Sequence, residues 1–198
     1  KLPDEFIRDM NTNKTVYIVN KSLSAKPGLN RFQWDLRHAG PWLKDVRRRY
    51  QNGPIAAPGT YTVKLTLNNT VLEQTFELIS DPRVLESGVT QSHIEEQINL
   101  QKKISAFISE VQRYQTSLEE EAKSLKSANN TTGRLKKVEA AISHLKTGDG
   151  AYPQPMLNDQ ILYLYNMIGD ADQIPGKEAE LRLEELSGMF EKIKMELK

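Results

Sequence analysis

Cysteine is missing from the 198-residue chain. Its absence excludes disulfide bonds, thiolate nucleophiles and cysteine-ligated metal sites. Histidine is scarce as well, with three residues in all, His38, His93 and His144. None of them has another ligand type at metal-site spacing, so each is interpreted as an ordinary surface residue. The sequence therefore predicts neither a metal site nor a cofactor.

Long hydrophobic runs and a strong charge of one sign are also missing. The longest apolar runs, such as 161–165, are far shorter than the roughly 20 residues that cross a bilayer, so no membrane span is predicted. Residues 1–20 lack the pattern of a secretory signal. The net charge is +1, and the densest basic cluster, 47–49, is short. Because nucleic-acid binders normally present a strongly basic face, nucleic acid is not predicted as a partner.

No set of residues in the sequence forms a recognisable active site. A hydrolase needs paired carboxylates, or a nucleophile with its base. The acidic run 119–121 fits the solvated face of a long helix. The segment 148–150, Gly-Asp-Gly, lacks the Gly-Lys-Ser/Thr of a phosphate loop and the alternating acids of a calcium loop, so it is interpreted as a helix connection. We therefore predict no catalytic residues and no enzymatic activity.

The first half of the sequence alternates apolar and polar residues in short runs, which is typical of strands. The predicted strands cover residues 15–19, 30–36, 60–67 and 71–79. In the second run Phe32, Trp34 and Leu36 are expected to point into a core. Asn68 and Asn69 separate the last two runs and suit a tight hairpin. Residues 1–87 are therefore predicted to form an immunoglobulin-like antiparallel β-sandwich.

After Asp81 and Pro82 the hydrophobic period changes from two to about 3.6 residues. Thr90 or Ser92 can cap a first helix of about 35 residues, which we infer from the length of its apolar stripe. Residues 88–198 are therefore predicted to form an antiparallel bundle of three to four long helices. The whole chain is then an α+β protein of two domains, 1–87 and 88–198. The expected core residues are Ile94, Ile98, Ile104, Ile108, Val111, Leu118, Ala122 and Leu125 in the first helix, Leu135, Val138, Ile142 and Leu145 in the second, Leu157, Ile161, Leu164 and Ile168 in the third, and Ala179, Leu183, Leu186, Phe190, Ile193 and Leu197 in the last.

The segment 37–58 is a long predicted loop that contains Trp42 and Tyr50. Long loops in compact domains are often functional. Exposed aromatic side chains on such a loop could stack against sugar rings, so Trp42 and Tyr50 are candidate ligand contacts. In the competing interpretation, Trp42 folds back over an open end of the sandwich.

Three segments carry a resemblance to a known family. They are GLNRFQWDLRHAGP at 28–41, GPIAAPGTYTVKLTL at 53–67 and Asp81-Pro82-Arg83. Together they resemble the C-terminal region of secreted bacterial sortilin-like or glycosyl-hydrolase-like β-propeller proteins with BNR-type repeats. In those proteins a propeller precedes an immunoglobulin-like module similar to that of flagellar hook-capping proteins, and a helical tail follows. Residues 164–165 and 171–172 resemble that tail.

The resemblance implies a function and a location for the chain. It implies a non-catalytic accessory module of a larger exported protein, found in the periplasm, on the outer surface or outside the cell. The expected partner is the upstream propeller or another protein, and the parent protein can be hydrolase-like. The alternative function is a carbohydrate-binding module that uses the 37–58 loop to hold a glycan. Residues 1–14 do not clearly supply the family's first strand, so that strand is either missing or replaced by 15–19, and no active-site residue is carried over.

Overall fold

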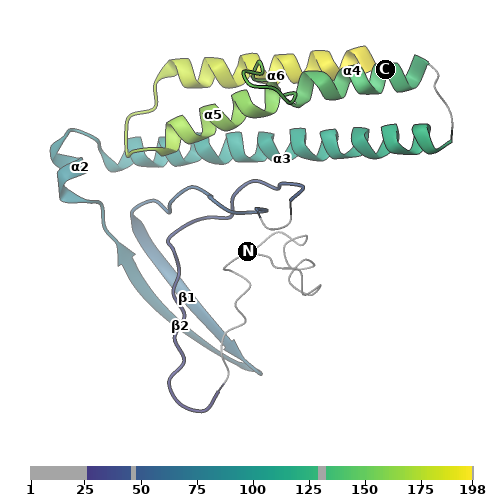
Figure 1. Ribbon diagram of the computed structural model, residues 1–198. Helices are drawn as coiled ribbons and strands as arrows, with labels where there is room; N and C mark the ends of the chain where they lie inside the picture. The colour runs from purple at the N-terminus through teal and green to yellow at the C-terminus, as the bar shows by residue number, and fades with distance from the viewer. Residues whose placement is uncertain (1–25, 46–47, 129–132, 198) are drawn as a thin grey trace.

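The computed structural model describes residues 26–45, 48–128 and 133–197. Figure 1 shows a β-hairpin at one end of a group of helices that lie side by side. In this part of the chain the elements follow one another as β1 (Gly59–Leu67), β2 (Thr70–Leu78), α2 (Pro82–Glu86), α3 (Gln91–Ser127), α4 (Gly133–Leu145), α5 (Leu157–Gly169) and α6 (Lys177–Leu197).

The hairpin forms where the alternating pattern and the Asn-Asn pair predict it. β1 and β2 are antiparallel, and Leu65 lies opposite Leu72. Asn68 in the connecting turn has a φ of 53°, which asparagine tolerates better than most residues. Because paired residues project to the same side of a hairpin, Tyr61 and Phe76 share one face.

The predicted β-sandwich is wrong. Within residues 26–45, 48–128 and 133–197, the two strands of the hairpin are the whole of the sheet structure. The run 30–36 forms no strand, and an isolated bridge joins Arg37 to Ile55. The run 15–19 lies outside the described residues. No second sheet covers the hairpin in the described chain, and Val63 and Leu65 are 55% and 44% exposed.

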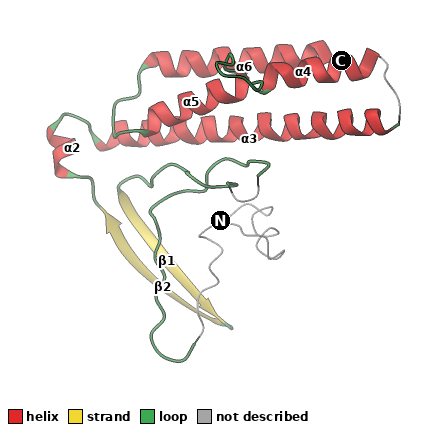
Figure 2. Cartoon of the chain, viewed as in Figure 1, coloured by secondary structure: helices red, strands yellow, loops and turns green. Residues whose placement is uncertain are grey.

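Helix α3 is the longest element and extends along the whole group of helices (Figure 2). It begins with a capping box in which Thr90 Oγ1 accepts the His93 backbone N–H, and His93 Nδ1 accepts the Thr90 N–H. The cap is thus Thr90, one of the two predicted, with His93 in the position that Glu or Gln usually takes. The capping box therefore fixes the first turn of α3, which follows β2 and the short helix α2 in the chain.

The helices pack around a core to which all four long helices contribute. α4 and α5 lie one after the other along α3, and α6 covers them (Figure 1). Phe190 of α6 is 1% exposed and meets the rings of Phe107 and Tyr114 edge-on, at centroid distances of 5.8 and 5.4 Å. The helical content is consistent with the predicted bundle. The predicted core residues are buried, except for Leu125, Ile142 and Leu183, which pack against the core partly buried.

Candidate functional site

Residues 36–45 and 48–58, called the arm below, precede β1 in the chain. Two runs of the arm lie antiparallel and exchange backbone hydrogen bonds, His38 N–H to the Pro54 carbonyl at 2.9 Å and Gly40 N–H to the Tyr50 carbonyl at 2.8 Å. Glycine is required where the runs touch. A Cβ atom on Gly53 would lie 1.9 Å from the His38 carbonyl oxygen. The described residues of the predicted loop are therefore closely packed against one another.

The arm is attached to the helices by contacts between residues far apart in the sequence. The Trp42 backbone N–H donates to Ser109 Oγ of α3 at 2.9 Å. The Lys44 ammonium group pairs with the Glu119 carboxylate, also on α3. The hydroxyl group of Tyr165 on α5 donates a hydrogen bond to the backbone carbonyl of Asn52 in the arm. The arm thus bridges two helices along one side of the bundle.

Trp42 and Tyr50, the predicted ligand contacts, both take part in packing. Trp42 is half-buried, and the guanidinium carbons of Arg49 and Arg113 each lie 4.8 Å from the centroid of its ring. Such contacts are cation–π interactions. Tyr50 is 8% exposed and has a φ of 61°. Trp42 therefore lies against α3, not over the end of a sandwich, and the ligand role of the two residues stays a prediction.

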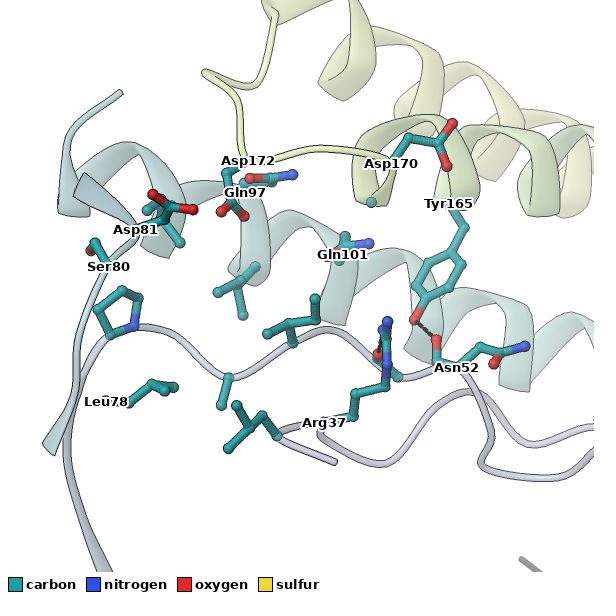
Figure 3. Close-up of a pocket in the computed structure, with 18 of the residues that line it drawn as sticks. Arg37, Asn52, Leu78, Ser80, Asp81, Gln97, Gln101, Tyr165, Asp170 and Asp172 are labelled. Atoms are coloured by element: carbon teal, nitrogen blue, oxygen red, sulfur yellow. Dashed lines mark hydrogen bonds between the residues drawn. The ribbon is translucent and has the colours of Figure 1, made fainter. Parts of the chain in front are cut away.

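A cleft of about 300 Å³ lies between the arm, the end of β2, the start of α3 and the end of α5 (Figure 3). Ile94 and Ile98 of α3 contribute apolar surface to it. Polar groups line another part of it. They are Arg37, Asn52, Ser80, Asp81, Gln97, Gln101, Asn166, Asp170 and Asp172 together with Tyr165. The cleft combines an apolar wall with polar groups, as small-ligand sites usually do.

Gln97 has a structural role at the edge of the cleft. Its Nε2 donates to the carbonyls of Ile168 and Ala171 at 2.5 and 2.6 Å. Its Oε1 accepts the Gln173 N–H at 3.2 Å. The side chain thereby satisfies carbonyls that the end of α5 leaves open. Both donor hydrogens of the Gln97 amide are therefore used, and the side chain holds the chain after α5 in place.

Gln101, one turn further along α3, is different. It is 7% exposed, yet its amide makes no hydrogen bond within the described residues. Every fully buried side-chain nitrogen or oxygen of the described chain has a partner, so the Gln101 amide must reach the open space of the cleft. It lies close to Gly169, where a Cβ atom would come within 2.1 Å of Gln101 Nε2. An unpaired amide therefore faces the cleft.

Two ionisable groups that line the cleft have shifted pKa values, Tyr165 and Asp81. Burial raises the pKa of Tyr165 to about 12, and the charge of Arg37 partly offsets this effect. Hydrogen bonds from Arg83 lower the pKa of Asp81 to about 2. One guanidinium N–H of Arg37 donates to the Gly53 carbonyl at 2.9 Å. Tyr165 is therefore neutral and Asp81 is negatively charged at pH 7.

The described residues of the cleft offer charged groups and hydrogen-bonding groups to a bound molecule. In the described part of the chain, no group of three or more His, Asp or Glu side chains could hold a metal ion. The histidines lie in separate places, His38 in the arm, His93 at the start of α3 and His144 in the last turn of α4. Burial, and secondarily the charge of Lys102, lower the pKa of His38.

The sequence interpretation missed this cleft because its walls come from four separate segments. One signal was present. Gln97 and Gln101 interrupt the apolar stripe of α3 between Ile94 and Ile104, although both are buried. A buried polar side chain needs a partner or contact with water. Two such residues one turn apart could have marked the site.

The chain matches no protein-family model, no curated protein and no solved structure. Among the described residues, no helix is both long and apolar enough to span a bilayer, in agreement with the sequence prediction.

Proposed function

We propose that the chain is a non-catalytic accessory module of a larger exported bacterial β-propeller protein, and that it contacts the propeller through its hairpin. The observation that carries the proposal is an apolar face of the hairpin that the described residues leave open. The resemblance of residues 28–41 and 53–67 to the C-terminal region of such proteins supports the choice of partner.

One face of the hairpin is apolar along most of its length. Cross-strand pairing puts Val63, Leu65, Leu67 and Leu72 on the same side, and these four residues are called the hairpin face below. They are 55%, 44%, 62% and 62% exposed. The opposite side carries Lys64, which pairs with Glu73 at 2.8 Å. The hairpin face is thus distinct from a second side that suits water.

The end of this face near the arm is already covered. Trp34 lies 5.6 Å from Tyr61 and 6.4 Å from Phe76, measured between ring centroids. Among the described residues the cover ends there, and the hairpin face continues beyond it toward the turn. An isolated two-stranded hairpin is at best marginally stable in water. A partner that covers the hairpin face would therefore stabilise it, because contiguous exposed apolar surface often marks an interaction site.

The helices fit the role of a rigid support. At 1.5 Å per residue, α3 extends over about 55 Å, and the core fixes it to α4, α5 and α6. The carbohydrate-binding alternative has less support, because Tyr50 is 8% exposed and cannot offer a ring face to a sugar without moving.

A single-cysteine experiment tests the proposal, since the chain has no cysteine of its own. Leu65→Cys places a thiol on the hairpin face, and Thr62→Cys places one on the opposite side as the matched control. The labelling rate is measured in the isolated chain and in the propeller-containing parent. We expect Leu65→Cys to react fast in the isolated chain and at least about tenfold more slowly in the parent, a factor that corresponds to about 1.4 kcal/mol of protection.

Thr62→Cys should react at similar rates in both proteins. Equal labelling of Leu65→Cys in the two proteins would contradict the proposal. Protection of Thr62→Cys as well would show general burial of the hairpin, not docking through the hairpin face.

A further inference from the structure

We propose that the cleft beside Gln101 binds a small apolar amino acid or dipeptide in its zwitterionic form. This inference does not depend on the proposed function, because it concerns another surface of the chain. It rests on an unpaired buried amide, on free groups of opposite charge at the two ends of the cleft, and on the apolar wall between them.

The Gln101 amide is the first element of the site. An amide has two donor hydrogens and a carbonyl acceptor, and none of these has a partner in the described chain. Gln101 is only 7% exposed, so few water molecules can reach its amide. A ligand with both a donor and an acceptor would satisfy Gln101.

The charged ends of the cleft are the second element. At one end, one guanidinium N–H of Arg37 donates to the Gly53 carbonyl, and the other guanidinium N–H groups make no hydrogen bond within the described residues. At the other end, the Asp172 carboxylate has neither a hydrogen bond nor an ion pair in that part of the chain. Figure 3 shows Gln101 between these ends, with Asp172 beside Gln97 and Arg37 near Tyr165.

Asp81 and Asp170 also line the cleft. The Asp81 carboxylate is already occupied by Arg83, with a contact of 2.6 Å. Asp170 follows the last turn of α5 as its C-cap. Figure 3 shows Asp170 near Tyr165 and Asp172 beside Gln97, so Asp172 is the acidic group that favours a cationic end of the ligand at its end of the cleft. Arg37 favours an anionic end, since guanidinium groups bind carboxylates in a fork.

The apolar wall and the size of the cleft decide the remaining chemistry. Ile94 and Ile98 offer an aliphatic surface from α3, and Ile55 offers another from the arm. A volume of about 300 Å³ is at the small end of ligand pockets. An ammonium, a carboxylate and an aliphatic side chain within this volume describe a leucine-like amino acid or its dipeptide.

The test combines blocked ligands with matched variants. L-leucine and leucyl-leucine are titrated into the 198-residue chain, and binding is followed by calorimetry and by the side-chain amide signal of Gln101 in ¹H–¹⁵N spectra. N-acetyl-leucine lacks the ammonium group, and leucinamide lacks the carboxylate. We expect each blocked compound to bind about tenfold more weakly than its parent, the effect of one lost charged contact.

The variants separate the two ends of the cleft. Asp172→Asn should weaken leucine binding about tenfold. It should leave N-acetyl-leucine binding unchanged, because that compound has no ammonium group for Asp172 to contact. Arg37→Gln should weaken leucine binding and spare leucinamide. Asp159→Asn, an exposed carboxylate of α5 outside the cleft, is the control and should bind as the unmodified chain does.

Two results would overturn the proposal. One is the absence of any change in the Gln101 amide signal at millimolar leucine or leucyl-leucine. The other is equal binding of the blocked and unblocked compounds. Asp172 is exposed, so its variant should fold normally and keeps the test valid even if Arg37→Gln loosens the arm.

Discussion

The hydroxyl group of Tyr165 on α5 donates a hydrogen bond of 2.6 Å to the backbone carbonyl of Asn52 in the arm. Tyr165 is 4% exposed, so this bond forms in a place that water reaches poorly. It joins the arm to the bundle directly beside the cleft. The position of one cleft wall therefore depends on a side chain from the opposite wall.

Replacing Tyr165 by phenylalanine should lower the free energy of unfolding by about 1 kcal/mol, the usual net value of one such hydrogen bond. Tyr163→Phe is the matched control on the same helix, where the side chain is 71% exposed, and we expect a change within about 0.5 kcal/mol. Urea unfolding followed by circular dichroism measures both. Equal effects of the two substitutions would show that the bond to Asn52 contributes little.

Tyr165 should also make the chain sensitive to alkaline pH. Its pKa is raised from 10.0 to about 12 in the folded chain, so the folded state holds the phenolic proton more tightly than the unfolded state. This stabilisation is complete below pH 10 and is lost as the pH rises from about 10 to 12. Two pKa units correspond to about 3 kcal/mol.

The alkaline effect is measured as a difference, because lysines titrate in the same range. The free energy of unfolding of the unmodified chain should fall more steeply between pH 9 and pH 12 than that of Tyr165→Phe. Parallel curves for the two proteins would mean that the phenol ionises as easily in the folded as in the unfolded chain.

Gly53→Ala should disrupt the arm. The added Cβ would lie 1.9 Å from the His38 carbonyl oxygen, a backbone atom that cannot rotate away. We expect a loss of about 1–3 kcal/mol, as for other overpacked sites, and faster amide exchange at His38, whose N–H bonds to the Pro54 carbonyl.

Gly188→Ala is the control for this substitution. Gly188 lies inside α6 with no atom within 4 Å of an added Cβ, so alanine should stabilise the chain by up to about 1 kcal/mol. A Gly53→Ala protein as stable as the unmodified chain would show that the two runs of the arm can separate without cost.

Local patterns were sufficient to predict the helices and the hairpin. Helical periodicity reports burial on one side of a helix, and in a bundle each buried stripe is covered by another helix of the same kind. Leu157, Ile161 and Leu164 of α5, for example, are all at most 3% exposed. The Asn68 turn likewise depends on its own backbone conformation and not on distant residues.

The same patterns could not show which surface covers the strands. Alternation at Phe32, Trp34 and Leu36 predicted a second sheet, but Trp34 packs on Tyr61 and Phe76 of the hairpin, and Phe32 is 53% exposed. The arm and the cleft depend on contacts between distant segments, which no local period encodes. For the cleft, the signal available in the sequence was the pair Gln97 and Gln101 within the apolar stripe of α3.

The last prediction concerns Phe190, which fills the core between α3 and α6. Its ring is 1% exposed and touches Phe107 and Tyr114 edge-on. Phe190→Ala removes these contacts and leaves a cavity, so we expect a loss of about 3–5 kcal/mol. Because whole domains are stable by about 5–15 kcal/mol, thermal unfolding should begin at a clearly lower temperature.

Leu181→Ala on the same helix provides the comparison, since Leu181 is 63% exposed and should cost within about 0.5 kcal/mol. Hydrogen exchange then shows how far the damage spreads. Amides of α3 that pack against Phe190 should lose protection in Phe190→Ala, because the helices share one core. Loss of protection confined to α6 would mean that α6 packs as a separable element, since the rest of the bundle would then retain its stability without the aromatic contacts of Phe190.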